Sequence, residues 1–202
     1  MKGMTMNYVY AFEDGDGKNK KLLGGKGANL CEMTQFGLNV PPGFVITTEA
    51  CLTYLDNGSS ALPDGIMDEV RVQMQQVEAK TGKGFGDADN PLLVSVRSGS
   101  ALSMPGMMDT ILNLGLNDET VEGLAQTSGD ERFAWDSYRR FMQMYGNVVM
   151  GIDKDAFEHE LSAVKKKAKV KSDVNLTEQH LDEVADRLGI DVLEFRRMNL
   201  LR

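Results

Sequence analysis

The 202-residue sequence contains only two cysteines, two histidines and five prolines, and it lacks any long apolar run. No stretch approaches the ~18 apolar residues that a membrane-spanning helix requires, and the N-terminus lacks the charged-then-apolar pattern of a secretory signal. We therefore expect a cytoplasmic location and no membrane partner. In that compartment Cys31 and Cys51 are expected to be reduced packing residues rather than a disulfide.

Positive charge is also scarce, because 22 lysines and arginines face 30 aspartates and glutamates, which gives a net charge of −8. Nucleic-acid backbones are held by basic surfaces, so we expect no nucleic-acid partner. The local exception is "VKKKAKVKS", residues 164–172, where five lysines occupy seven positions. Such a run is more commonly a solvated helix face than a polyanion site, and we assign no function to it.

The first part of the sequence, residues 1–117, alternates short apolar runs with glycine-rich turns. "GFVIT" at 43–47 and "LLVSV" at 92–96 are bounded by Gly or Pro, as strands often are. Between these runs, an apolar stripe with helical spacing predicts a helix over about residues 64–80; it consists of Ile66, Val70, Met74 and Val77. We therefore expect an α/β (α+β) lobe over this part.

The second part, residues 118–202, is predicted to be a mainly helical subdomain. One apolar helical face carries Ala134, Tyr138, Phe141 and Tyr145, and another carries Leu181, Val184, Ala185 and Leu188. The aromatic cluster of this part is expected to be a packing seam rather than a cofactor site; it comprises Phe133, Trp135, Tyr138, Phe141 and Tyr145.

"LLGGKGANLCEM", residues 22–33, has the outline of a phosphate cradle made of a strand, a turn and a helix. Small glycines permit close approach, amides at a helix N-terminus attract anions, and Lys26 supplies a positive charge. The stretch is not a P-loop, because Gly27 rather than Ser or Thr follows the lysine. A surface turn with a solvated lysine explains the motif equally well.

Arg97 follows the apolar run 92–96, so it would lie at the carboxyl end of a strand, where α/β sheets tend to bind ligands. Its guanidinium fork suits phosphate oxygens. The alternative is a surface arginine that pairs with an acidic neighbour. Likewise, the methionines of "SMPGMMDTI", residues 103–111, could simply fill gaps in a core.

Together these stretches resemble the N-terminal part of the pyruvate, phosphate dikinase family. "VSVRSGSALSMPGMMDTILNLGLND", residues 94–118, matches the family signature nearly throughout, and residues 24–33 and 37–51 match two further blocks. Looser versions occur in phosphoenolpyruvate synthase and related dikinases, but "MPGMMDTILNLGLND" favours the phosphate-dependent family. The resemblance runs in order over about residues 6–160.

The resemblance implies a partial ATP-grasp-type nucleotide-binding domain with ATP as substrate. Lys26 and Arg97 then take the roles that hold the nucleotide phosphates. A pliable loop would close over the phosphates as a lid; it comprises Gly106, Met107, Met108, Asp109 and Thr110. The family makes phosphoenolpyruvate, AMP and pyrophosphate from pyruvate, ATP and phosphate through a phosphohistidine, with Mg²⁺ assisting. Its full-length members are commonly homo-oligomeric.

Several parts of that machinery are not found in this sequence. His159 and His180 do not stand in the context of the carrier histidine, and we expect both on helix surfaces. The later acidic Mg²⁺ ligands and the pyruvate-binding barrel are also missing. We therefore expect a nucleotide-binding fragment whose partners are the remaining dikinase domains and which is catalytically incomplete alone. The alternatives are a phosphoenolpyruvate synthase-like fragment and a non-catalytic interaction module that binds no nucleotide.

The last residues depart from the dikinase pattern. "EVADRLGIDVLEFRRMNLLR", residues 183–202, resembles a helical segment of molybdenum hydroxylase large subunits. A plain alternative is a last amphipathic helix capped by Asp191, with Glu194 three residues later. No molybdenum chemistry follows from so short a segment.

Overall fold

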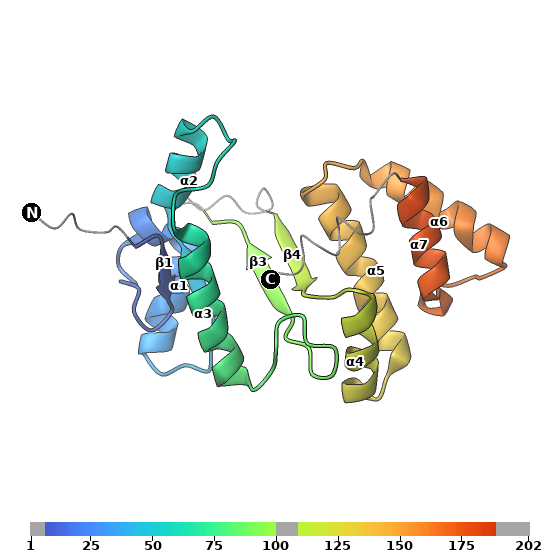
Figure 1. Ribbon diagram of the computed structural model, residues 1–202, viewed down its shortest axis with the longest axis horizontal. Coiled ribbons are helices and arrows are strands. Elements are labelled where there is room, and N and C mark those ends of the chain that lie inside the picture. The colour runs from blue at the N-terminus through green and yellow to red at the C-terminus, as the bar shows by residue number, and fades with distance from the viewer. Residues whose placement is uncertain (1–6, 100–108, 189–202) are drawn as a thin grey trace, which may run out of the picture. The chain divides into compact units, whose positions relative to one another are not determined.

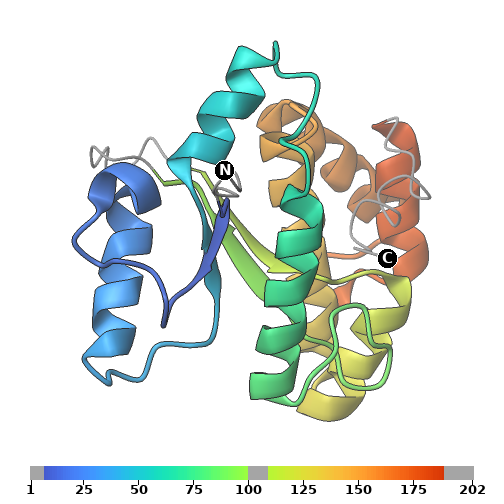
Figure 2. The same cartoon turned by 60° about the vertical axis from the view of Figure 1, so that its left-hand side comes forward.

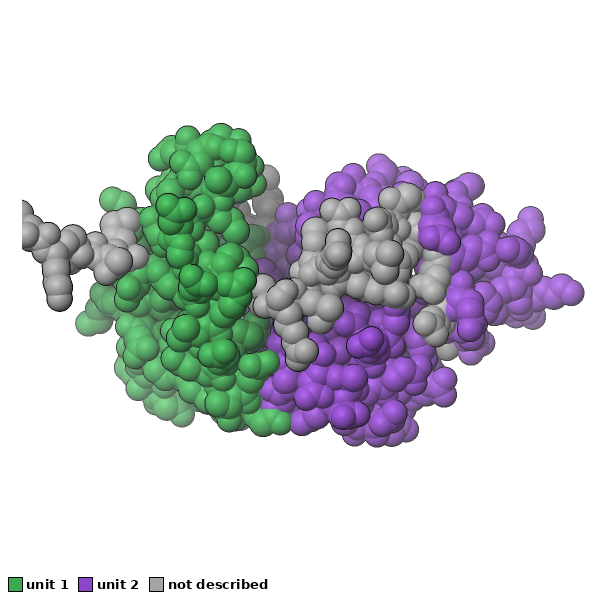
Figure 3. Space-filling view, in the orientation of Figure 1, with its two compact units in different colours: residues 1–82, 98–108 green, residues 83–97, 109–202 purple. Residues whose placement is uncertain are grey.

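The structure, a computed structural model, describes residues 7–99 and 109–188 of the chain. Figure 1 labels its helices and strands. The chain divides into two compact units (Figure 3): the first comprises residues 1–82 and 98–108, and the second comprises residues 83–97 and 109–202. Each unit contains a hydrophobic cluster of its own.

The described part of the first unit combines a small antiparallel sheet with helices. In chain order its elements are β1 (Val9–Ala11), α1 (Lys20–Gln35), β2 (Phe44–Ile46), α2 (Thr48–Asp56) and α3 (Ile66–Thr81). β1 pairs with β2, and Val9 lies opposite Ile46. α1 contributes Leu23 and Cys31 to a core that includes Val45 of β2, while α3 contacts β1 (Figure 2).

α3 confirms the helix predicted over residues 64–80. It begins after Gly65 and ends before Gly82, whose left-handed φ values of 79° and 67° are accessible to glycine at little cost. The predicted apolar stripe is its buried face, namely Ile66, Val70, Met74 and Val77. Oε2 of Glu69, in the first turn of α3, accepts the backbone N–H of Val9 at 2.9 Å and so occupies the outer edge of β1.

The described part of the second unit is an antiparallel hairpin followed by helices. Its elements are β3 (Val94–Arg97), β4 (Thr110–Leu114), α4 (Asp118–Ser128), α5 (Glu131–Val148), α6 (Lys154–Ala168), the 3₁₀ helix η1 (Asp173–Asn175) and α7 (Glu178–Arg187). α5 contacts β4, α4 and α6, which makes it the central helix of the unit. Its predicted apolar face is confirmed as buried: Ala134, Tyr138, Phe141 and Tyr145.

The architecture is therefore a mixture of helices and small two-stranded sheets. The strands predicted at 43–47 and 92–96 are confirmed as β2 and β3, although β3 runs from Val94 to Arg97. Both strand pairs in residues 7–99 and 109–188 are antiparallel. Arg97 thus ends a strand as predicted, but the rule that ligands bind beyond the carboxyl ends of parallel strands does not apply to it.

Two packing expectations need correction. Phe133 is 52% exposed, so it does not belong to the predicted aromatic seam, whereas Phe141 and Tyr145 do, with ring centroids 5.8 Å apart. Both cysteines are free as expected, but Cys51 is exposed and only Cys31 is a packing residue. The helical arrangement of α5 explains why Phe133 is exposed, because the buried stripe of this helix begins at the next residue, Ala134.

Composition predicted no membrane span, and none of the helices in residues 7–99 and 109–188 is long and apolar enough to be one. Most of the segment that resembles molybdenum hydroxylases, including Asp191 and Glu194, lies outside the described residues. That resemblance and the predicted last helix stay predictions. The described beginning of the segment, residues 183–188, forms the end of α7 and the residue that follows it.

Candidate functional site

The glycine-rich stretch before Lys26 interrupts helix α1. Gly24 has φ 68° and ψ 166°, which is not helical, and the chain is helical on both sides of it. A side chain disfavours this backbone conformation, so the position requires glycine. The predicted strand before the glycines is therefore wrong, because Lys20–Leu23 forms a helical turn instead. The buried side chain of Leu23 explains that turn, since it joins the core with Cys31.

The break at Gly24 creates a second helix N-terminus within α1. The first N–H groups of a helix have no acceptor inside it and attract anions. Gly27, in the first turn after the break, is buried against β2: a Cβ added there would lie 2.7 Å from Cγ1 of Val45. This close approach fixes the helix against the sheet and so fixes where Lys26 emerges.

The half-buried Lys26 reaches the backbone of a distant segment. Its Nζ donates a hydrogen bond of 3.1 Å to the carbonyl of Ser98, which belongs to the same unit and directly follows Arg97 in the chain. The ammonium is not engaged in any ion pair found in the described residues.

Arg97 and Thr110 lie opposite each other at the end of the β3–β4 hairpin where residues 98–109 connect the two strands. They are cross-strand partners, and Asp109 immediately precedes Thr110 in the chain. Arg97 is exposed, and no carboxylate among the described residues lies within ion-pair distance of it. The predicted lid residues Gly106, Met107 and Met108 lie outside the described residues.

Further positive charge lies in the sequence before the break, outside the glycine-rich motif. Lys18, Lys20 and Lys21 precede Lys26, so residues 18–26 hold four lysines and no carboxylate in a chain of net charge −8. All three are exposed. The signal was present in the sequence as a charge asymmetry within nine residues. Such a local excess of positive charge attracts phosphate groups.

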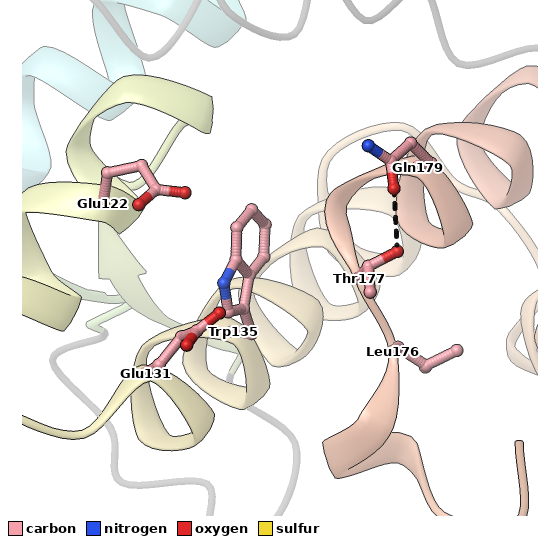
Figure 4. A pocket seen from close by; sticks show the side chains of 6 residues that line it. All are labelled: Glu122, Glu131, Trp135, Leu176, Thr177 and Gln179. Atoms are coloured by element: carbon pink, nitrogen blue, oxygen red, sulfur yellow. Dashed lines mark hydrogen bonds between the residues drawn. The ribbon is translucent and has the colours of Figure 1, made fainter.

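Two pockets formed by the described residues, one in each unit, are poor phosphate sites. A pocket of about 160 Å³ in the second unit places two glutamates beside an indole, with a short polar segment opposite (Figure 4); its lining is Glu122, Glu131, Trp135, Leu176, Thr177 and Gln179. A pocket of about 310 Å³ in the first unit also carries two carboxylates, those of Asp68 and Glu69. Carboxylates repel phosphate, so neither pocket suits a triphosphate.

The histidines lie on helices, as predicted. His159 on α6 is exposed, and its Nδ1 lies 3.2 Å from Oε1 of Glu160. Nδ1 of His180, on α7, accepts the backbone N–H of Thr177 at 3.0 Å. Both contacts are local to one helix and its cap. Neither histidine contacts a cluster of polar groups that would suit a phosphocarrier.

Comparison with known proteins places the glycine break and Lys26 in a nucleotide-binding family. Residues 20–62, which run from α1 to beyond α2, match the family described as "Pyruvate phosphate dikinase, AMP/ATP-binding domain". The chain is 57% identical over 180 residues to pyruvate, phosphate dikinase of Entamoeba histolytica, a match that covers 89% of this chain and 20% of the relative.

Similar relatives occur in bacteria and plants. The chain is 51% identical over 180 residues to the Clostridium symbiosum dikinase, covering 89% of this chain and 20% of that one. It is 55% identical over 171 residues to chloroplastic dikinase 1 of Zea mays, covering 85% and 18%. The chain thus spans about one fifth of the length of these relatives. It belongs to the pyruvate, phosphate dikinase family, and its residues 20–62 to the AMP/ATP-binding domain of that family.

Proposed function

We propose that the chain binds ATP through its phosphates, as the nucleotide-binding part of a pyruvate, phosphate dikinase. The observation that carries the proposal is the glycine break directly before Lys26, which lies inside the segment that matches the AMP/ATP-binding family. There a free helix N-terminus, an ammonium group and a local excess of lysine combine in one place. Each of these features attracts phosphate oxygens.

Lys26 and Arg97 act on the same triphosphate in this proposal. Its support is the resemblance of residues 24–33 and 94–118, which carry these two side chains, to two blocks of the dikinase family. An ammonium supplies a point charge, and a guanidinium can hold two phosphate oxygens at once. In this proposal Asp109 and Thr110 border the phosphates. Together with Gly106, Met107 and Met108 they form a lid that closes over the nucleotide.

The finer fold and location are part of the same proposal. We infer an ATP-grasp-type domain whose α/β lobe covers residues 1–117 and whose helical subdomain covers residues 118–202, in a cytoplasmic protein. The overall dikinase reaction converts ATP, phosphate and pyruvate to AMP, pyrophosphate and phosphoenolpyruvate. We propose this reaction for a chain as long as the full-length relatives, not for these 202 residues alone. The remaining dikinase domains are the proposed partners.

Magnesium is implied by the family but has no site among the described residues. In residues 7–99 and 109–188, no three His, Cys, Asp or Glu side chains gather where they could hold a metal ion. We therefore assign no Mg²⁺ ligands to this chain and route no step through the ion. What these residues supply is phosphate binding.

The proposal is tested by calorimetric titration of the chain with ATP. Lys26→Ala and Arg97→Ala should each weaken binding at least tenfold, about 1.4 kcal/mol. Arg97→Lys should also weaken it, because an ammonium cannot copy the bidentate fork. The matched controls are Lys166→Ala and Arg132→Ala, two exposed residues of the helical unit. They should leave the affinity unchanged.

Two results would contradict the proposal. If the folded wild-type chain does not bind ATP, the nucleotide function fails and a non-catalytic interaction module takes its place. If ATP binds but neither Lys26→Ala nor Arg97→Ala changes the affinity, the nucleotide site lies elsewhere.

A further inference from the structure

Thr48 makes an unusual side-chain contact to helix α1. It is the first residue of α2, and its Oγ1 donates to the carbonyl of Lys21 at 2.6 Å, with the carbonyl of Leu22 next at 3.2 Å. The hydroxyl is not needed to begin α2, because Oγ1 of Thr47 already accepts the N–H of Ala50 as the helix cap. The contact therefore serves α1 rather than α2.

These two carbonyls are the ones that the break at Gly24 deprives of their helical donors. In an uninterrupted helix, the carbonyl of Lys21 accepts the N–H of Gly25, and that of Leu22 accepts the N–H of Lys26. Both bonds span Gly24 and require helical dihedrals there, whereas Gly24 has φ 68° and ψ 166°. The hydroxyl of Thr48 stands in for the lost donors.

We propose that Thr48 is a positioning residue that holds the phosphate cradle open. By satisfying the carbonyls of Lys21 and Leu22, it leaves the N–H groups of Gly25 and Lys26 free to donate to phosphate oxygens. It also stabilises the turn that aims the side chain of Lys26. The inference rests on the proposed nucleotide function. A residue that merely joined α2 to α1 would affect stability without affecting these two amides.

The first test is ATP affinity in three variants, two that remove a threonine hydroxyl and one that keeps it. Thr48→Val keeps the shape of the side chain but removes the donor, and it should weaken ATP binding at least tenfold. Thr48→Ser keeps the hydroxyl and should bind within twofold of wild type. Thr53→Val is the matched control, because Oγ1 of Thr53 donates to the carbonyl of Glu49 within α2 and touches neither carbonyl of α1.

The second test needs no nucleotide. Amide hydrogen exchange, followed by NMR, should be fast at Gly25 and Lys26 in the wild type and in Thr48→Val at least tenfold slower. The reason is that the helix can recover these donors once the hydroxyl is gone. If Thr48→Val is too unstable to fold, Gly24→Ala tests the same device, since alanine disfavours the φ of 68°. It should protect both amides and weaken ATP binding while Thr48 is intact.

The two tests separate this inference from the function on which it rests. If the wild type does not bind ATP, the proposed function fails, and the exchange rates at Gly25 and Lys26 still decide the role of Thr48. If the wild type binds ATP but Thr48→Val matches Thr53→Val in both affinity and exchange, the inference is overturned and the proposed function stands.

Discussion

In the proposed anion site, one residue contributes through its backbone and another through its side chain. Gly24 supplies a backbone conformation that other residues disfavour, and Lys26 supplies a charge that glycine lacks. Two residues of separation place the charge in the first turn after the break. There it acts in the same direction as the helix dipole, whose positive end also attracts phosphate.

Asp173 is a single residue whose negative charge stabilises the fold through ion pairs and is not assigned to ligand binding. Nζ of Lys165 donates to its Oδ1 at 2.5 Å, and Nη1 of Arg139 lies 3.8 Å from its Oδ2. The hydrogen bond from Lys165, aided by the charges of Arg139 and Lys165, outweighs partial burial and lowers the pKa of Asp173 below its ordinary value. The stability gained is present above the unfolded pKa of ~3.9 and is lost as pH falls through the lower folded pKa.

Asp173→Asn should therefore destabilise the chain in a pH-dependent way. Urea unfolding should show a lower midpoint for the variant at pH ~7, and its deficit relative to wild type should shrink as pH falls from ~5 towards ~2. Asp186→Asn, an exposed position on α7, is the control and should show no such change. An equal deficit at every pH would mean that the carboxylate charge is not what stabilises the cluster.

Residue types and spacing predicted the place of some of these residues in the fold and missed the contacts of others. Arg97 was correctly expected at the end of a strand, because an apolar run precedes it. Ser98 and Thr48 could not be found from the sequence. Ser98 contacts a residue 72 positions away and Thr48 contacts residues 26 and 27 positions away, and no local sequence pattern indicates these contacts. The convergence of Lys26 and Arg97 on one ligand stays a prediction.

Among the elements, α6 corrects the interpretation of the lysine run. Lys165 pairs with Asp173, and Lys167 pairs with Glu183 of α7. The side chain of Lys165 is only 24% exposed, so the expected solvated face is wrong for that residue. The run ends α6, where positive charge interacts favourably with the helix dipole. These lysines thus provide positive charge at the end of a helix and form ion pairs with acidic neighbours.

Replacing the five lysines of residues 165–171 with glutamine should lower stability but leave ATP affinity within about twofold. The ion pairs to Asp173 and Glu183 would be lost, whereas the proposed phosphate site lies on α1. Replacement by arginine, which keeps the charge, is the control. A tenfold loss of affinity in the glutamine variant, about 1.4 kcal/mol, would show that the run holds phosphate after all.

α7 packs against the rest of the second unit, although it lies beyond residues 6–160, over which the dikinase resemblance runs. Leu181 and Val184 are buried in its core, and Arg187 pairs with Glu160 of α6 at 3.2 Å. Val184→Ala should destabilise the chain by about 2 kcal/mol, since two buried methyl groups are lost. Thermal unfolding measures this, with the exposed Val149→Ala as control. An unchanged unfolding temperature would mean that the end of α7 is not part of the folded unit.

Periodicity predicted the elements better than it predicted their breaks. α3 and α5 carry regular apolar stripes, and their buried faces are those expected. α1 was expected as a strand followed by a helix, because Leu22 and Leu23 precede two glycines. Two apolar residues are too few to distinguish a strand from one helical turn, and burial of Leu23 in the core selects the turn.

On the scale of the whole molecule, the chain is matched to dikinases that are about five times as long. Ordered blocks over most of its length allowed the family to be predicted from the sequence, because several motifs in a fixed order are far more specific than any one motif. The antiparallel pairing of β3 with β4 was not predictable in the same way. Strand partners are set by contacts distant in sequence, which local patterns do not encode.

The chain should bind ATP without making phosphoenolpyruvate. The resemblance to the dikinases implies a carrier histidine for phosphoryl transfer, and neither His159 nor His180 has a suitable setting: the first contacts Glu160, and the second accepts a cap N–H of its own helix. The described residues also hold no cluster of metal ligands. Positioning and charge neutralisation are the main sources of catalysis in phosphoryl transfer, so binding the phosphates alone should not suffice. The chain is incubated with pyruvate, phosphate, Mg²⁺ and labelled ATP, and a full-length pyruvate, phosphate dikinase serves as the positive control. Labelled phosphoenolpyruvate or an acid-labile phosphoprotein from the chain alone would contradict this prediction and give one of its histidines a catalytic role.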